Sequence, residues 1–91
     1  MTKRVRLHVS GLVQGVGFRK LIERVACGHS LDGWVRNQPD GRVEIEAQVP
    51  AKDVEELLKK AGCGSSMSQV TEIKITDLLP DEKQKGLTIR F

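Results

Sequence analysis

The apolar residues of this chain repeat with two different periods, and the order of those periods restricts the folds that the chain can adopt. Residues 4–10 alternate polar and apolar side chains, which is typical of a strand with one face exposed to water. In residues 18–28 the apolar side chains recur three and four positions apart, as in an amphipathic helix that stops at Gly28. A strand is therefore followed by a helix after a short, glycine-containing loop.

The rest of the chain continues this alternation. Residues 31–38 and 42–48 are strand-like and flank the sequence Pro-Asp-Gly at 39–41, which predicts a β-hairpin. Residues 51–62 place apolar side chains on one stripe, with acidic residues early and lysines late, which suits the dipole of a helix. Two more strands, joined by a charged loop at 78–85, complete the chain. The expected strands are 4–10, 31–38, 42–48, 70–76 and 87–91, and the expected helices are 18–28 and 51–62.

The resulting order, β-α-β-β-α-β followed by a short C-terminal edge strand, predicts an α+β fold of the ferredoxin-like class. In this sandwich an antiparallel sheet carries both helices on one face. A chain of 91 residues can bury a single core, so we expect one domain over residues 1–91.

This topology brings two segments to one edge of the sheet. The loop 11–18 leaves the first strand, and Asn37 lies near the end of the second. Because a strand–helix–strand unit crosses over in a right-handed sense, these two strands run parallel and end at the same edge. Asn37 shares its strand phase with Gly33 and Val35. If those two residues face the helices, Asn37 faces the start of the first helix.

Composition argues against several classes of protein. Fifteen Lys and Arg against 12 Asp and Glu give a net charge of +3, which favours an anionic ligand without requiring a polyanion. No segment resembles a signal peptide or a membrane helix, so we expect a cytoplasmic protein. Cys27 and Cys63 lack metal-ligand spacing. A bridge between them is geometrically open, but cytoplasmic disulfides are rare and we expect two buried or half-buried free thiols. His8 and His29 have no partner at a suitable spacing, and we expect surface side chains and no metal site.

The loop before the first helix reads GLVQGVGFR, residues 11–19. Gly15 and Gly17 can adopt positive φ and present successive backbone N–H groups just before a helix N-terminus. Such a place attracts a phosphate-sized anion, and the guanidinium of Arg19 can add two hydrogen bonds. Without an anion, a cation at this position costs roughly 0.3–1 kcal/mol. Glycine-rich loops often only turn corners, however, and the Gly-Lys-Ser/Thr ending of a P-loop is missing, so the loop alone leaves phosphate binding open.

Two segments together resemble the acylphosphatase family. They are GLVQGVGFR at 11–19 and GWVRNQPDGRVE at 33–44, which contains Asn37 eighteen residues after Arg19. The resemblance covers essentially the whole chain. Beyond residue 44 it lies in the pattern of residues rather than in the exact sequence. It implies a ferredoxin-like enzyme that hydrolyses acyl phosphates to a carboxylate and inorganic phosphate, without a metal or other cofactor. We further expect a monomer with no nucleic-acid or membrane partner.

The resemblance also implies roles for individual residues. Arg19 corresponds to the arginine that binds the phosphate, and Asn37 to the asparagine that positions the attacking water. The chain departs from the family pattern at Ser30 and at 64–67, which puts stability in doubt more than activity. The phosphate oxygens would be held by backbone amides of the loop, those of Gln14, Gly15, Val16, Gly17 and Phe18.

The chemistry of an acyl phosphate matches this inventory of residues. Its leaving group is a carboxylate, whose conjugate acid has a pKa of about 4, so it departs without a proton. The transition state is loose, and positioning and electrostatics carry the catalysis. A general acid, a Ser/His/Asp arrangement and a Cys/His pair are therefore not required near the loop.

Two other functions are open at this stage. Domains of this type also occur within larger carbamoyl-transfer maturation proteins, so the chain could be an acylphosphatase-like partner-binding or regulatory module. A ferredoxin-like RNA-binding module is the second alternative, but the strand residues 4–8 and 42–46 carry no aromatic side chains to stack on bases. Trp34 is expected to pack rather than to stack.

Overall fold

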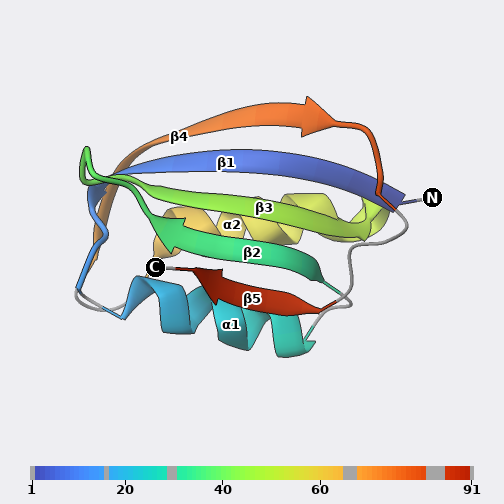
Figure 1. The fold of residues 1–91 in the computed structure, drawn as a ribbon, viewed down its shortest axis with the longest axis horizontal. Coiled ribbons are helices and arrows are strands. Elements are labelled where there is room, and N and C mark those ends of the chain that lie inside the picture. Colours follow the sequence, from blue (N-terminus) through green and yellow to red (C-terminus); the bar gives the residue numbers. More distant parts are fainter. Residues whose placement is uncertain (1, 16, 29–30, 65–67, 82–85, 91) are drawn as a thin grey trace.

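The computed structural model describes residues 2–15, 17–28, 31–64, 68–81 and 86–90. Its helices and strands follow the order expected from the sequence (Figure 1). They are β1 (Thr2–Leu12), α1 (Phe18–Gly28), β2 (Asp32–Asn37), β3 (Val43–Pro50), the 3₁₀ turn η1 (Ala51–Asp53), α2 (Val54–Cys63), β4 (Gln69–Leu78) and β5 (Leu87–Arg90).

The strands form one five-stranded sheet in the order β4-β1-β3-β2-β5. β1 pairs antiparallel with β3 and β4, and β2 pairs antiparallel with β3, so β1 and β2 run parallel to each other as predicted. The ferredoxin-like class is thereby confirmed. The C-terminal strand differs from the expected antiparallel sheet, because β5 pairs in parallel with β2, with Leu87 opposite Gly33. Gly86 anchors this pairing: its N–H donates to Asp32 Oδ1 (2.6 Å) and its carbonyl accepts from the Gly33 N–H (2.9 Å).

Both helices cover the same face of the sheet, and the hydrophobic core lies between them and the strands (Figure 1). α1 buries Phe18 and Ile22, and α2 buries Leu57 and Ala61. The strands contribute every second side chain to this layer, namely Val5, Leu7, Val9, Val35, Val43, Ile45, Ala47 and Val49.

Tertiary contacts move several boundaries from the expected positions. β1 extends beyond the predicted 4–10 at both ends, because β3 and β4 pair along both of its edges. The predicted helix 51–62 begins as a tight 3₁₀ turn after Pro50, and its α-helical part starts only at Val54. α1 has the predicted bounds. His29, Ser30 and 65–67 lie outside the described residues.

The face of the sheet opposite the helices is less exposed than its alternating pattern predicted. On β3, Glu44, Glu46 and Gln48 are each at most 6% exposed. Two arginines of β1 lie across this face: Arg4 Nη2 donates to Glu46 Oε2 (2.8 Å), and Arg6 Nη2 donates to Glu46 Oε1 (2.9 Å). Long basic side chains therefore cover the carboxylates and replace water around them.

Glu44 is held from two sides in the same way. His8 Nε2 lies 2.8 Å from Glu44 Oε2, and Arg36 Nε donates to Glu44 Oε1 at 2.6 Å. Burial alone would raise the pKa of the Glu44 carboxyl, but the hydrogen bonds from His8 and Arg36 outweigh it and lower the pKa below its usual value. His8, expected at the surface without a partner, is thus paired. We call this set the ion-pair face: Arg4, Arg6, His8, Arg36, Glu44 and Glu46.

Candidate functional site

The loop between β1 and α1 begins later than the sequence predicted, because Gly11 belongs to β1. Gly11 has φ +121° and lies at the register shift between β1 and β4. A Cβ at this position would lie 2.0 Å from the carbonyl oxygen of Gln69. Gly11 is therefore explained by the close approach of two strands, and the loop proper starts at Val13.

Gly15 and Gly17 do have the positive φ expected of them, +72° and +80°, and the space beside each Cα is open. The carbonyl of Gly17 accepts the hydrogen bond of the Leu21 N–H (3.1 Å), so the α-helical ladder starts there. The amides of the first helical turn have no acceptor within a helix, and they stand at the positive end of its dipole. Val16 lies outside the described residues.

A cavity of about 180 Å³ opens at this point. Phe18 anchors its base, since its side chain is buried in the core at the first position of α1. Arg19 and Lys20 bring two positive charges, and no acidic side chain is found among the described residues of its lining. An anion of phosphate size finds backbone amides, a helix N-terminus and a guanidinium here. The lining consists of Val13, Gly15, Gly17, Phe18, Arg19 and Lys20.

Asn37 lies at the end of β2, opposite Val43 of β3. It shares its strand face with Gly33 and Val35, which are both buried, and Val35 belongs to the core beneath the helices. The Asn37 side chain therefore projects on the helix side of the sheet, as predicted. Its Oδ1 is shielded from solvent and accepts no hydrogen bond from the described part of the chain.

Asn37 does not line the cavity itself, but the loop is hydrogen-bonded to the segment that follows it. Gln14 Nε2 donates to the carbonyl oxygens of Gln38 (2.6 Å) and Arg42 (2.9 Å). The sequence predicted a role for the Gln14 backbone amide and missed this contact of its side chain. A long amide side chain in a loop of glycine and apolar residues was the signal that could have revealed it.

Comparison with known proteins identifies the family of the chain. The family model described as Acylphosphatase matches residues 5–89. The chain belongs to the acylphosphatase family. A curated Acylphosphatase of Chlorobaculum tepidum is 52% identical over 79 residues, which are 87% of this chain and 86% of that protein.

Solved structures show the same relationship to the acylphosphatase family. The crystal structure of acylphosphatase from Bacillus subtilis superposes with a TM-score of 0.93 at 37% identity and covers both chains completely. The crystal structure of T. kodakarensis HypF matches 98% of this chain at 28% identity and a TM-score of 0.84, but this covers only 12% of the HypF chain. The same fold is thus found both as a chain of this size and as a small part of a longer one.

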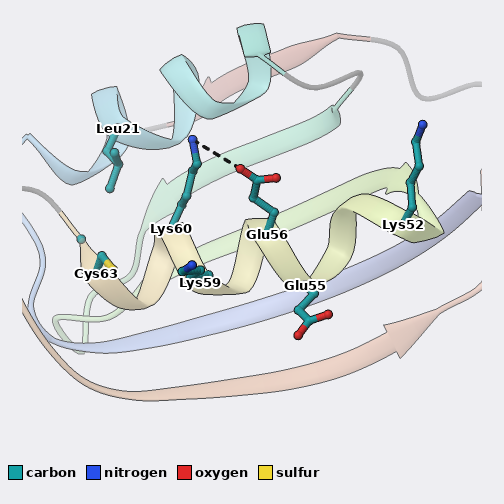
Figure 2. Close-up of a pocket in the computed structure, with 8 residues that line it drawn as sticks. Leu21, Lys52, Glu55, Glu56, Lys59, Lys60 and Cys63 are labelled. Atoms are coloured by element: carbon teal, nitrogen blue, oxygen red, sulfur yellow. Dashed lines mark ion pairs between the residues drawn. The ribbon is translucent and has the colours of Figure 1, made fainter.

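A larger cavity, of about 750 Å³, has no residue of the β1–α1 loop in its described lining. Figure 2 shows it along α2, with Leu21 of α1 on its opposite side. Its lining mixes lysines with Glu55 and Glu56, and Lys60 Nζ lies 3.8 Å from Glu56 Oε1. It contains neither Arg19 nor Asn37. Because its charges are of both signs, carried by η1 and α2, we take the smaller cavity as the candidate site.

The remaining residues considered from the sequence have other surroundings. Cys63 is a free thiol, but it is exposed at the end of α2 and not buried or half-buried as expected. The side chain of Cys27 lies outside the described part of the structure. Trp34 is only 9% exposed and lies under Arg36, whose guanidinium carbon is 5.3 Å from the centre of the ring, so it offers no open face for a base. No described helix is long and apolar enough to cross a membrane.

Proposed function

We propose that this acylphosphatase-family protein hydrolyses acyl phosphates, with the phosphoryl group bound in the cavity of the β1–α1 loop. The proposal rests on the contact between two segments. One is the β1–α1 loop, which places backbone amides and Arg19 at a helix N-terminus. The other is the end of β2, which carries Asn37. Gln14 links the two by hydrogen bonds. The monomeric state stays a prediction from the sequence.

Arg19 and the loop amides would bind the three equatorial oxygens of the phosphoryl group. The loop amides proposed for this are those of Gln14, Gly15, Val16, Gly17 and Phe18. Fixed N–H donors and a guanidinium stabilise the charge that accumulates on these oxygens as the bond to the leaving group breaks. The bound anion also removes the unfavourable interaction of Arg19 with the helix dipole.

Asn37 would hold the attacking water. Its Oδ1 has no hydrogen-bond partner among the described residues, and a rotation of the amide toward the cavity would let it accept a hydrogen bond from this water. The water oxygen then forms a bond to phosphorus while the bond from phosphorus to the acyl oxygen breaks. The electron pair stays with the carboxylate, and both protons of the water leave on inorganic phosphate.

This reaction needs neither a general acid nor a metal ion for its leaving group, because the carboxylate is already a weak base. We therefore propose a metal-independent hydrolase in which positioning and electrostatics supply the rate enhancement. The cytoplasmic location stays a prediction from the sequence.

The first test is the hydrolysis of benzoyl phosphate, followed by absorbance in buffer that contains a metal chelator. Arg19→Ala should lower kcat by about 100- to 1,000-fold and weaken inhibition by inorganic phosphate. Arg24→Ala, which removes an exposed arginine of the same helix, is the matched control and should retain wild-type turnover.

Asn37→Ala separates the two proposed roles. It should lower kcat about 100-fold while the inhibition constant of phosphate changes by less than about twofold. An equal loss of phosphate affinity in Arg19→Ala and Asn37→Ala would refute this division of roles. If the folded wild-type protein shows no turnover, a partner-binding or regulatory module is favoured instead. The match to a small part of the longer HypF chain is compatible with such a module.

A further inference from the structure

The side chain of Gln14 joins the β1–α1 loop to the β2–β3 hairpin. Its Nε2 donates to the carbonyl oxygens of Gln38 and Arg42, at 2.6 and 2.9 Å. A side-chain amide has two N–H donors, so these two bonds use both. Gln14 is half-buried, and hydrogen bonds that are partly removed from water are stronger than those on the surface.

The turn that accepts these bonds is closed by its own contacts. The Gln38 N–H donates to the Arg42 carbonyl (2.8 Å), and the Gly41 N–H donates to the Gln38 carbonyl (3.1 Å). Asp40 Oδ1 accepts from the Arg42 N–H (3.0 Å), and this bond holds the pKa of the Asp40 carboxyl below its usual value. Loss of the Gln14 amide should therefore release the turn from the loop without opening the turn.

Asn37 directly precedes this turn, at the end of β2. No described residue donates a hydrogen bond to its Oδ1. The position of the amide is therefore set by the position of the strand end and not by a side-chain contact. The proposed reaction requires the water at Asn37 to lie in line with the bond that breaks in the loop. A displacement of about 1 Å in such an arrangement can lower the rate about 100-fold.

We infer that the side chain of Gln14 is a positioning residue that fixes the strand end bearing Asn37 relative to the phosphate-binding loop. This inference rests on the proposed function. It gives the Gln14 side chain a role that is separate from the phosphate contact proposed for its backbone amide. Gln14 acts through Asn37, so its removal should affect the chemical step more than the binding of phosphate.

The test compares Gln14→Met with Gln48→Met. Methionine keeps the length of glutamine and lacks both N–H donors. Gln48 is a matched control because its amide also makes two hydrogen bonds, donating to the Asp81 carbonyl (2.9 Å) and accepting from the Asp81 N–H (2.6 Å). It lies toward the other end of β3, opposite Arg4.

The measured quantities are kcat and KM for benzoyl phosphate and the inhibition constant of inorganic phosphate, on variants whose folding is checked by circular dichroism. Gln14→Met should lower kcat about 10- to 100-fold and change the inhibition constant by less than about twofold. Gln48→Met should leave both within about twofold. An unchanged kcat in Gln14→Met, or a loss that Gln48→Met matches, overturns the inference.

A double-mutant cycle tests whether Gln14 acts through Asn37. In the Asn37→Ala background, Gln14→Met should lower kcat by less than about threefold, because the group that it positions is gone. A full 10- to 100-fold loss in that background overturns the inference. Failure of the proposed function looks different, since the folded wild-type protein would then show no turnover, or Asn37→Ala alone would retain wild-type kcat. If Gln14→Met does not fold, Gln14→Leu, which also lacks both N–H donors and adds no charge to the loop, is measured with the same expected outcomes.

Discussion

Two groups of basic side chains in this molecule have opposite surroundings. On the ion-pair face, Arg4 and Arg6 share the carboxylate of Glu46, which is almost fully buried. At the β1–α1 loop, Arg19 and Lys20 line a cavity together with glycines and apolar residues, and its described lining includes no acid. The first group is paired with a carboxylate inside the fold, and the second lines the cavity that we propose as the binding site of an anion.

The contrast teaches what an arginine indicates in a small sheet protein. An arginine at an alternate position of a strand can be satisfied by a carboxylate on the neighbouring strand, and it then serves the fold. An arginine in the first turn of a helix interacts unfavourably with the helix dipole, so its presence there calls for a different explanation. In this chain the proposed reason is the phosphoryl group of a substrate.

The largest effect expected on the ion-pair face is that of Glu46→Ala on stability. The change leaves Arg4 and Arg6 without the acceptor that they share. Removing one partner of a fully buried pair costs about 3–5 kcal/mol; because both arginines are partly exposed, we expect about 2 kcal/mol. Urea unfolding at pH 7 measures this loss. Turnover of benzoyl phosphate by the folded variant should stay at the wild-type level. A loss of turnover would show that the ion-pair face also serves the reaction, contrary to the contrast with the loop.

A smaller effect is expected from a methyl group at the loop. Gly15 and Gly86 both have φ +72° with open space beside the Cα, so Ala costs about 1–2 kcal/mol of stability at either position. Only at Gly15 would the methyl group stand beside the amides proposed to bind phosphate. Gly15→Ala should raise the inhibition constant of phosphate about tenfold, and Gly86→Ala should leave it unchanged. Equal inhibition constants in the two variants would show that the loop does not bind the anion.

The smallest effect concerns pH. Because the pKa of Glu44 is lowered in the folded protein, its ion pairs stabilise the fold above the ordinary carboxyl pKa of about 4.3, and this contribution is lost as the pH falls through the folded pKa. Glu44→Gln should therefore be about 1 kcal/mol less stable than wild type at pH 7, with the difference shrinking below about pH 4. Urea unfolding across pH measures it. Glu72→Gln, at an exposed position, is the control. A stability difference between Glu44→Gln and wild type that persists at pH 3 would show that it does not come from the ionised Glu44 carboxylate.

The sequence predicted the outline of the candidate site, because its parts are local. Gly15, Gly17 and Arg19 lie within five consecutive residues, so chain geometry alone places them at the start of α1. The position of Asn37 followed from the handedness of the β1–α1–β2 unit and from strand phase.

Contacts between distant residues could not be predicted in this way. Gly11 was expected in the loop, and only the pairing of β1 with β4 shows that it lies against Gln69. The link from Gln14 to Gln38 and Arg42 depends on how the loop folds back over the hairpin turn. The burial of Glu44 and Glu46 depends on which side chains of β1 and β2 lie across β3.

The sequence by itself determined the order of helices and strands, the face that each of them buries, and the residues proposed for catalysis. The order and the buried faces follow from periodicity, which acts over a few positions of the chain. The residues proposed for catalysis follow instead from the resemblance of two segments to the acylphosphatase family. The tertiary structure alone decided that β5 joins β2 in parallel, that the charged face is closed by ion pairs, and that Gln14 ties the loop to the strand end of Asn37. These depend on side chains and strands that meet only after folding, and a local pattern carries no information about which of several possible partners is met.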